Sequence, residues 1–422
     1  MLIEFYGENF GCFRDPFCLS MMAQPNLDPG SERGIVEVPV EGEDKPLCLL
    51  RCAAIYGPNA SGKSTVLDAA WSLGHLISAS GLFEPKAEIL HYSPFAGQSQ
   101  RSPVALGVKA IIDGKVYEYA IKYGAREFIE EDLIDLSTDE VLIRRREQEV
   151  GGTWAELPNI RTILTDFRCN ALVLSLAELF APKLAARIAG VLKAILSESH
   201  HPGGRAGEQS VSMVATRTRN DPAFGSWLGQ QLQAADTGIE SFTVFPKETV
   251  AELMQKAGYE RKGKGHKAAD FFVFGHANGA GGFKLAQTEE SDGTKKLIFF
   301  SPLMYSLETS ADPLVVFVDE IEESLHPDLL EAIIRHFNWL LPAEKVRGQL
   351  IFATHETRLL DHEARYAPLR RDQIYLTSKG NDGAAELYSV GDFGPRPNHN
   401  IRKRYLQGRY GAVPSIGPWG DD

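Results

Sequence analysis

The sequence has few cysteines, and their spacing suits neither a metal site nor a disulfide framework. Only five occur in 422 residues, and none forms a Cys-x-x-Cys pair. The 11 histidines form no cluster with ligand spacing either. These absences favour free thiols in a reducing compartment and predict no structural metal.

Long apolar runs and an excess of basic residues are also missing. No run approaches the roughly 18 residues of a membrane span, and the start, MLIEFYGENFGCF, does not read as a secretion signal. Lys and Arg number 44 against 56 Asp and Glu, a net charge of -12. This balance disfavours a surface that binds nucleic acid in bulk but is compatible with a local basic groove. We therefore expect a cytoplasmic globular protein without membrane contact.

The remaining composition is that of an ordinary globular protein, with 43% hydrophobic and 24% charged residues. At about 150 residues per domain, the length suggests two or three domains. Strand and helix patterns alternate near both ends of the chain, with a helical stretch between them. We expect residues 1–165 and 271–422 to form the two parts of one α/β core, and residues 166–270 to form a mostly helical insertion.

A glycine-rich loop stands between a predicted buried strand, which begins at Leu47, and a helix with apolar residues at helical spacing from Val66 to Ile77. The loop GPNASGKS matches the phosphate-binding pattern G-x-x-x-x-G-K-[ST] in full. Glycines let backbone N–H groups point at phosphate oxygens, and the helix start adds the positive end of its dipole.

This pattern predicts that Lys63 reaches the β- and γ-phosphates of ATP and that Ser64 ligates Mg²⁺. The alternative is a glycine turn with an incidental lysine. The predicted nucleotide-binding residues of the loop are Gly57, Pro58, Asn59, Ala60, Ser61, Gly62, Lys63, Ser64 and Thr65.

Two carboxylates follow a second predicted buried strand, Leu314 to Val318. Ligands of α/β sheets bind at the carboxyl ends of the strands. Asp319 is therefore predicted to hold Mg²⁺, directly or through water. Glu320 is predicted to polarise the attacking water as a general base. The alternative is a strand end with two solvated acids.

The segment ESDGTKKL resembles the signature motif of ABC-type ATPases. There, a serine and a glycine at a helix start contact the γ-phosphate held by the other subunit. The resemblance assigns this role to Ser291, Gly293 and Lys295, and the alternative is a plain helix cap.

Two more segments resemble the same group. ESLHPDLL resembles the stretch after its catalytic glutamate, and LIFATHETRLLD ends a buried strand at His355. This residue resembles the switch histidine that senses the γ-phosphate, and a structural histidine is the alternative. No glutamine loop is evident; Gln98 and Gln100, in a polar stretch, are the two candidates.

These motifs in this order resemble RecF/SMC-type ABC ATPases. More narrowly, they resemble the compact AAA-type ATPases of bacterial anti-phage defence (abortive infection) operons. The implied fold is α/β, an ABC-type P-loop NTPase head: a split α/β core with an antiparallel β-subdomain, plus a mostly helical insertion. The segments NFGCFRDPFCLSMM, FRCNALVLSLAELF, DTGIESFTV and RYLQGRYGAVP extend the resemblance over most of the chain.

The resemblance implies an ATPase that uses ATP and Mg²⁺ and pairs as a homodimer or higher oligomer through sandwiched ATP. It also implies a separate effector nuclease or toxin from the same operon. One alternative is a RecF-like repair ATPase that clamps DNA; another is the ATPase of a transporter. The segment GRYGAVP, Gly408 to Pro414, is assigned no chemistry, and contact with a partner or another subunit is a hypothesis.

Overall fold

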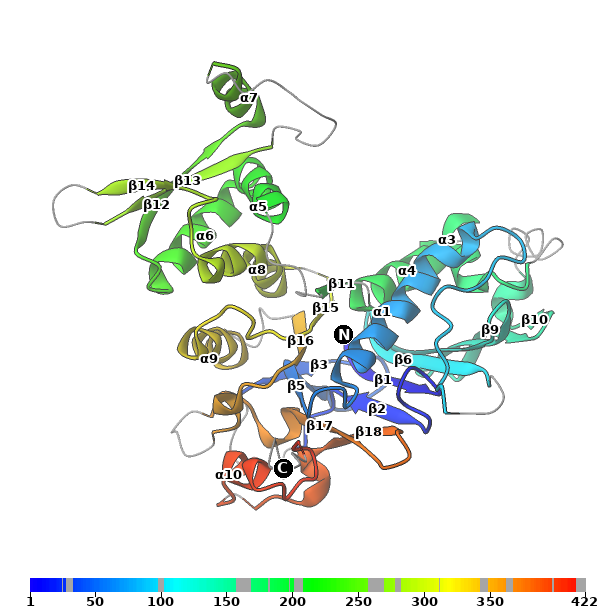
Figure 1. Ribbon diagram of the computed structural model, residues 1–422. Helices are drawn as coiled ribbons and strands as arrows, with labels where there is room; N and C mark the ends of the chain where they lie inside the picture. The colour runs from blue at the N-terminus through cyan, green and yellow to red at the C-terminus, as the bar shows by residue number, and fades with distance from the viewer. Residues whose placement is uncertain are drawn as a thin grey trace, which may run out of the picture. The chain divides into compact units, whose positions relative to one another are not determined.

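The computed structural model (Figure 1) divides the chain into two compact units. The first unit comprises Met1–His200, Leu307–Ile321 and Glu331–Asp422, and the second comprises His201–Ser306 and Glu322–Leu330. The structure describes residues 1–24, 26–27, 33–97, 102–156, 168–180, 183–196, 198–200, 208–256, 269–277, 282–310, 312–341, 348–361, 367–396 and 398–414.

A seven-stranded antiparallel sheet forms one layer of the first unit, in the order β10-β9-β8-β7-β6-β1-β2. Asp113 (φ 50°) and Gly114 (φ 84°) form the predicted turn between β6 and β7, and left-handed conformations at both positions are typical of a tight hairpin. The strands are β1 Leu2–Glu8, β2 Phe17–Ser20, β6 Val104–Ile112, β7 Lys115–Tyr123, β8 Phe128–Asp135, β9 Glu140–Arg146 and β10 Glu149–Gly151.

A six-stranded sheet, in the order β11-β15-β16-β5-β17-β18, forms the other layer. All neighbouring strands in it are parallel except β17 and β18. Every residue of β5 and β16 is buried, as expected of parallel strands covered on both faces. The strands are β5 Cys52–Tyr56, β11 Glu198–His200, β15 Leu314–Val318, β16 Gly348–Ala353, β17 Ile374–Lys379 and β18 Ala385–Ser389.

The apolar run that begins at Leu47 is not one strand, as the sequence suggested, but two. β4 (Leu47–Leu50) pairs with β3 (Ile35–Val38) in a separate two-stranded sheet, whereas β5 belongs to the parallel sheet. Arg51 lies between them, and its guanidinium donates to the carbonyl of Leu341 at 2.7 Å. A buried guanidinium needs such acceptors, and Arg51 has them at the point where the chain passes from one sheet to the other.

Helices α1 (Lys63–Ala79) and α4 (Lys183–Leu196) contact strands of both large sheets and so form the layer between them. Their buried apolar side chains join one core with both sheets and with α3 (Val173–Phe180). α1 and α4 approach closely at Gly74, where a Cβ would lie 2.8 Å from Leu196 Cβ. Glycine at this position therefore allows the two helices to pack.

Both expected ends of the helical insertion, at residues 166 and 270, differ from the division of the structure, in which the second unit comprises His201–Ser306 and Glu322–Leu330. α3 and α4 belong to the first unit, and β11 pairs with β15 at the edge of its parallel sheet. The reason is burial: Ile188 and Leu192 on α4 are fully buried in the core of the first unit, and leaving such side chains exposed would cost roughly 1.5–3 kcal/mol each.

The second unit combines helices with a three-stranded antiparallel sheet, β12-β13-β14. Asp221 caps α6 by accepting hydrogen bonds from the N–H groups of Ala223 and Phe224. The elements are α5 Glu208–Asn220, α6 Pro222–Ala234, β12 Ile239–Phe245, α7 Lys247–Lys256, β13 Phe271–His276, β14 Phe283–Ala286 and most of α8, Asp292–Thr309.

The remaining helices are short. α9 spans Pro327–Arg335 and continues into a π-helical turn, His336–Leu340. α10 spans Ile401–Leu406, and 3₁₀ turns cover Ser80–Leu82, Thr153–Glu156, Thr357–Leu360, Arg371–Gln373 and Val390–Phe393. None of the helices within the described ranges has the length and apolarity that crossing a membrane requires.

Candidate nucleotide site

The chain between β5 and α1 forms a tight loop that depends on small residues. Ala60 (φ 61°) and Gly62 (φ 110°) have left-handed backbone conformations, which glycine adopts at little steric cost. A Cβ on Gly57 would lie 2.3 Å from Thr377 Oγ1 on β17, and one on Gly62 would lie 2.9 Å from Cys12 Sγ. Glycine at both positions therefore lets the loop lie close against its neighbours.

Hydrogen bonds hold the loop around Lys63. Lys63 Nζ donates to the carbonyl oxygens of Gly57 and Pro58, at 3.0 Å each, and the side chain is buried. Ser61 Oγ donates to the carbonyl of Pro58 at 2.8 Å and lies 2.6 Å from Thr377 Oγ1. The ammonium group is thereby fixed against the loop backbone. Asn59, Ala60 and Ser64 are exposed, and Pro58 and Thr65 are half-buried.

Three adjacent parallel strands bring the predicted residues to one edge of the sheet. Val318 of β15 pairs with Phe352 of β16, and Ala353 of β16 pairs with Ile55 of β5. The carboxyl ends of these strands are therefore level. Asp319 and Glu320 follow the first strand, His355 follows the second, and the Gly57 loop follows the third. Ligands of parallel α/β sheets bind at this edge.

Asp319 has a carboxylate oxygen suited to a metal ion. Its Oδ1 atom is buried and has no hydrogen-bond partner within the described part of the chain. An ionised oxygen in this state is costly, and a bound cation would offset that cost. The hydroxyl of Ser64, at the start of α1, is exposed. Carboxylate and hydroxyl oxygens are hard ligands that suit Mg²⁺, so the two residues fit the predicted ion.

Glu320 is exposed and has a left-handed backbone conformation, φ 46°. For a residue with a Cβ this conformation costs roughly 1–2 kcal/mol. Sparsely populated conformations persist only where the surrounding structure enforces them, and they cluster at functional sites. Here the N–H of Ile321 donates to the carbonyl of Ala353 at 3.3 Å, so the turn after β15 is tied to β16. The turn presents the Glu320 carboxylate to water.

The loop that carries His355 is fixed by hydrogen bonds on both sides. The N–H of Thr354 donates to the carbonyl of Ile55 at 3.1 Å, and Thr354 Oγ1 accepts from the N–H of Glu356 at 3.0 Å. The Tyr56 hydroxyl donates to the carbonyl of Glu356 at 3.1 Å. The backbone at His355 is therefore held next to the end of β5, and its imidazole is exposed.

A cavity of about 640 Å³ opens beside the phosphate loop. Sequence reasoning identified four of the residues that line it but missed Tyr405 and Pro414. The Tyr405 ring contacts the Tyr56 ring edge-on, with centroids 5.8 Å apart. The only signal for Tyr405 and Pro414 was their place in the segment RYLQGRYGAVP, which carries no chemical motif. The lining residues are Gly57, Pro58, Asn59, His355, Tyr405 and Pro414.

The predicted signature residues belong to the second unit, at the start of α8. Ser291 Oγ accepts from the N–H of Thr294 at 3.1 Å, so Ser291 caps the helix. A Cβ on Gly293 would lie 2.8 Å from the carbonyl oxygen of Ser324, so the backbone approaches closely there. Lys295 Nζ donates to the carbonyl of Thr288 at 3.0 Å. The exposed Ser291 hydroxyl and the helix start offer donors to an anion.

Glu290, the residue before Ser291, is held in an almost fully buried pair with His276. Sequence reasoning missed this pair. His276 Nε2 lies 2.7 Å from Glu290 Oε1, and the two side chains are 9% and 4% exposed. The imidazole also stacks on Phe283, with centroids 5.1 Å apart and an interplanar angle of 8°. His276 is 14 residues from Glu290 along the chain, and no local pattern pairs them.

The two glutamine-loop candidates, Gln98 and Gln100, lie outside the described residues. Within the described ranges no group of three or more His, Cys, Asp or Glu side chains is arranged to hold a metal ion. The predicted Mg²⁺ ligands, the Asp319 carboxylate and the Ser64 hydroxyl, do not form such a group, because only one of them belongs to these four residue types.

A known protein family matches this chain. The family described as "AAA domain, putative AbiEii toxin, Type IV TA system" matches residues 52–161 and 185–361, which together are more than half of the chain. No curated protein matches the chain in sequence.

Two of the solved structures similar to this chain are SMC heads. One is a crystal structure of the SmcHead bound to the C-winged helix domain of ScpA, with a TM-score of 0.48 and 12% identity, covering 93% of this chain and 99% of that one. Another is the SMC head domain from Thermotoga maritima, with a TM-score of 0.43 and 14% identity, covering 92% of this chain and 98% of that one.

The family match includes the phosphate loop, both carboxylates after β15, the start of α8 and His355. The family match and the observed antiparallel and parallel sheets of the split core both confirm the predicted α/β fold class. The chain belongs to the family of AAA domains of the AbiEii-toxin type.

Proposed function

We propose that this AAA protein is an ATP-binding and ATP-hydrolysing switch that pairs through ATP. The observation that carries the proposal is the level ending of β15, β16 and β5, which brings Asp319, Glu320, His355 and the Gly57 loop to one sheet edge. An ATPase needs a phosphate cradle, a metal ligand and a base for water, and these residue types supply all three.

Each residue has a distinct task in this proposal. The loop N–H groups, the start of α1 and the Lys63 ammonium bind the phosphates of ATP. Ser64 and Asp319 would hold Mg²⁺, which neutralises phosphate charge when bound. Glu320 accepts a proton from the attacking water. His355, fixed by its loop, donates a hydrogen bond to the γ-phosphate.

Pairing follows from the residues at the start of α8. Ser291, Gly293 and Lys295 present donors and a positive charge that suit the γ-phosphate held by a second copy of the chain. Because this contact exists only with ATP in place, ATP shifts the equilibrium toward the pair. A homodimer, or a higher oligomer built from it, is the proposed nucleotide-bound state.

We propose further that the switch regulates a prokaryotic anti-phage defence system. Support comes from the family description, which names an AbiEii toxin and a type IV TA system. The chain carries no recognisable nuclease motif, so the proposed effector, a nuclease or toxin, is a separate polypeptide from the same operon. Hydrolysis would change which state of the switch contacts it.

Glu320→Gln tests this function because it keeps shape and hydrogen bonding but removes the base. We expect ATP turnover to fall by roughly 10²–10⁴-fold while ATP binding remains. In Mg-ATP the variant should form a longer-lived dimer than the wild type by light scattering. Adding Ser291→Arg should abolish that dimer through steric and charge clash.

Asp328→Asn is the matched control, because Asp328 is a highly exposed carboxylate nearby along the chain. It should leave both turnover and pairing unchanged. Wild-type turnover in Glu320→Gln, or ATP-dependent pairing in the double variant, would remove the proposed mechanism.

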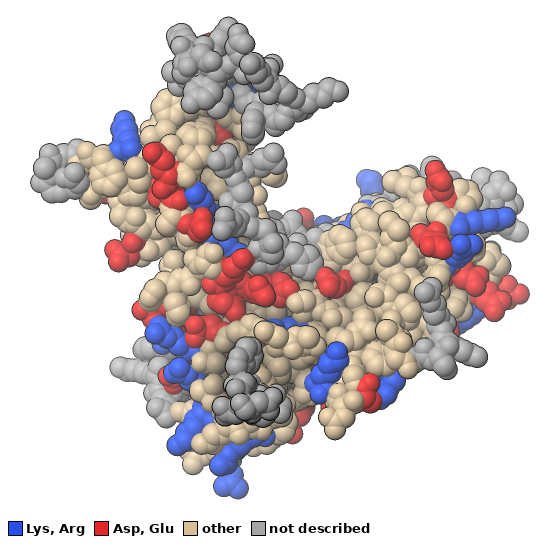
Figure 2. Space-filling model, viewed as in Figure 1, with Lys and Arg blue, Asp and Glu red and all other residues tan. Residues whose placement is uncertain are grey.

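A DNA-clamping ATPase is the second candidate, and a basic surface favours it. Figure 2 shows Lys and Arg side chains gathered over α10. The pKa of His399 is lowered, first by desolvation and then by the positive charges of Arg404, Arg396, Arg371 and Arg409. Several guanidinium groups therefore lie near one another in a chain whose net charge is -12.

Lys403→Glu combined with Arg409→Glu tests this candidate, since both residues are exposed. If the basic surface binds DNA, duplex affinity should fall steeply with salt in the wild type and should be lost in the variant. DNA affinity that is equal in both proteins would exclude this surface as a DNA site.

A further inference from the structure

The segment from Tyr405 to Pro414 has no task in the mechanism proposed above, although it borders the cavity beside the phosphate loop. Tyr405, near the end of α10, and Pro414 line this cavity together with His355 and the first three residues of the loop. No acidic side chain is among the described residues that line it. The cavity therefore suits an anionic group next to the residue proposed to sense the γ-phosphate.

The hydroxyl of Tyr405 is the part of this side chain that the cavity can use. The residue is only 7% exposed, and its ring packs edge-on against the ring of Tyr56. A ring enclosed in this way offers little free face on which a nucleotide base could stack. The hydroxyl forms no hydrogen bond with any residue that the structure describes, and a buried hydroxyl without a partner is costly. A ligand oxygen in the cavity would supply that partner.

The Tyr405 hydroxyl keeps its proton at physiological pH and can therefore donate it. Burial, and after it the proximity of Tyr388, raises the pKa of Tyr405 above its ordinary value of 10.0. A protonated phenol is a hydrogen-bond donor. Phosphate oxygens are charged acceptors, and hydrogen bonds to charged acceptors are stronger than those between neutral groups.

Basic side chains lie near the same segment. Burial raises the pKa of Tyr410, but the positive charges of Arg404, Arg371 and Arg409 oppose that rise. Positive charge around the segment is of the sign that attracts a phosphate group and repels a cation. The electrostatics and the free hydroxyl therefore favour the same kind of ligand.

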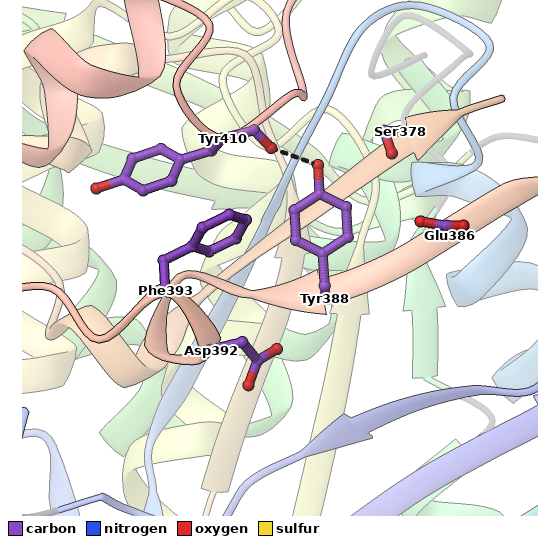
Figure 3. Close-up of a pocket in the computed structure, with 6 residues that line it drawn as sticks. All are labelled: Ser378, Glu386, Tyr388, Asp392, Phe393 and Tyr410. Atoms are coloured by element: carbon purple, nitrogen blue, oxygen red, sulfur yellow. Dashed lines mark hydrogen bonds between the residues drawn. The ribbon is translucent and has the colours of Figure 1, made fainter.

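The segment that follows Tyr405 is held in place by hydrogen bonds and by aromatic packing. The N–H of Gly408 (φ 70°) donates to the carbonyl of Tyr405 at 2.8 Å and closes a turn at the end of α10. The Tyr388 hydroxyl on β18 donates to the carbonyl of Tyr410 at 2.6 Å (Figure 3). The rings of Phe393 and Tyr410 pack edge-on, with centroids 5.1 Å apart.

The start of α10 contacts the loop that carries His355. Asn400 caps the helix, and Arg402 lies 4.0 Å from the carboxylate of Asp361. Asp361 ends the 3₁₀ turn that follows His355, and α10 packs against this turn. Tyr405 and His355 therefore reach the cavity from two segments that contact each other.

We propose that Tyr405 is a further nucleotide-binding residue, whose hydroxyl donates a hydrogen bond to the terminal phosphate of ATP beside His355. This inference rests on the proposed ATPase function and adds to it a residue that distinguishes ATP from ADP. Because ADP lacks the γ-phosphate, Tyr405 contributes only to the binding of the triphosphate. The GRYGAVP segment, anchored by Tyr388, supports the residue at the cavity wall.

Tyr405→Phe tests this inference, because it keeps the ring against Tyr56 and removes only the hydroxyl. Calorimetric titration of the full chain with Mg²⁺ compares ADP with β,γ-imido-ATP, which keeps the terminal phosphate oxygens and resists hydrolysis. We expect the affinity for the imido analogue to fall roughly tenfold and the affinity for ADP to stay unchanged. Tyr6→Phe is the matched control, since its hydroxyl bonds to Glu118 in the antiparallel sheet, and it should bind both nucleotides like the wild type.

Tyr388→Phe tests the anchoring, since it keeps the ring but removes the hydrogen bond to Tyr410. It should weaken binding of the imido analogue less than Tyr405→Phe does, and it should leave ADP binding unchanged. If Tyr388 acts through Tyr405, the double variant should bind the analogue like Tyr405→Phe alone. Weaker binding in the double variant than in Tyr405→Phe would overturn this positioning role.

The outcomes separate this inference from the proposed ATPase. Unchanged affinity of Tyr405→Phe for the imido analogue would overturn the inference, because its hydroxyl would then contact only water. Equal losses for ADP and for the analogue would also overturn it, because a purely structural role affects both nucleotides. A wild-type chain that binds neither nucleotide would instead remove the proposed ATPase function itself.

Discussion

The backbone N–H of Ile321 donates a hydrogen bond to the carbonyl of Ala353 at 3.3 Å. This bond joins the turn after β15, which carries Glu320, to the end of β16, which precedes the His355 loop. The backbone segments that carry the proposed base and the proposed γ-phosphate sensor are therefore linked directly. The turn on the β15 side of this link holds Glu320 in its left-handed conformation.

Lys63→Ala should weaken ATP binding at least tenfold, about 1.4 kcal/mol. It removes the ammonium that is held against Gly57 and Pro58, and charged contacts to phosphate are among the strong hydrogen bonds. Calorimetric titration with ATP measures the change. Lys45→Ala, at an exposed position, is the control and should bind like the wild type. Unchanged affinity in Lys63→Ala would contradict the phosphate-loop assignment.

His276→Ala should destabilise the fold and weaken ATP-dependent pairing. It leaves the carboxylate of Glu290, which is 4% exposed, without its partner. Leaving a buried acceptor without its hydrogen-bond partner typically costs about 1–3 kcal/mol, and more where the acceptor is charged. The loop before Ser291 would lose its anchor, whereas ATP binding by the phosphate loop should persist.

Chemical denaturation, light scattering and calorimetry measure these three effects of His276→Ala. His326→Ala provides the comparison, because that histidine is 70% exposed. Pairing and stability at wild-type levels in His276→Ala would show that the pair does not position the start of α8.

Glu131 should make the stability of the first unit depend on pH. It is fully buried, it accepts from the Tyr119 hydroxyl and from the N–H groups of Val173 and Leu174, and burial raises its pKa above the ordinary 4.5. A carboxyl whose pKa is higher in the folded state binds its proton more tightly there. The contribution of Glu131 to the stability of the folded state is therefore fully present below the pKa of the unfolded state. This contribution is lost as pH rises through the pKa of the folded state.

Glu131→Gln cannot ionise, so it isolates this effect. The stability of the wild type relative to Glu131→Gln should fall as pH rises above about 4.5, with a slope of at most about 1.4 kcal/mol per pH unit. Urea unfolding from pH 4.5 to 8 measures it. Glu140→Gln, at an exposed position on β9, should parallel the wild type. A difference between wild type and Glu131→Gln that does not vary with pH would disprove the assignment.

The sequence by itself determined those parts of the protein whose physics is local. The phosphate loop, from Gly57 to Thr65, is contiguous, and its glycines and lysine specify a backbone shape and a charge without help from the rest of the chain. β15 was evident because its apolar residues form one buried run. The Asp113-Gly114 turn was evident because two left-handed residues suit a tight hairpin.

The tertiary structure alone decided which distant segments meet. Tyr405 packs on Tyr56 across most of the chain, and no periodicity or spacing can encode such a contact. The first segment of the first unit extends past residue 166 to His200, and this depends on which core buries α3 and α4. Helical spacing shows that a side chain needs burial but does not specify the surface that buries it, because hydrophobic attraction has no direction. Only the assembled sheets and helices supply that surface.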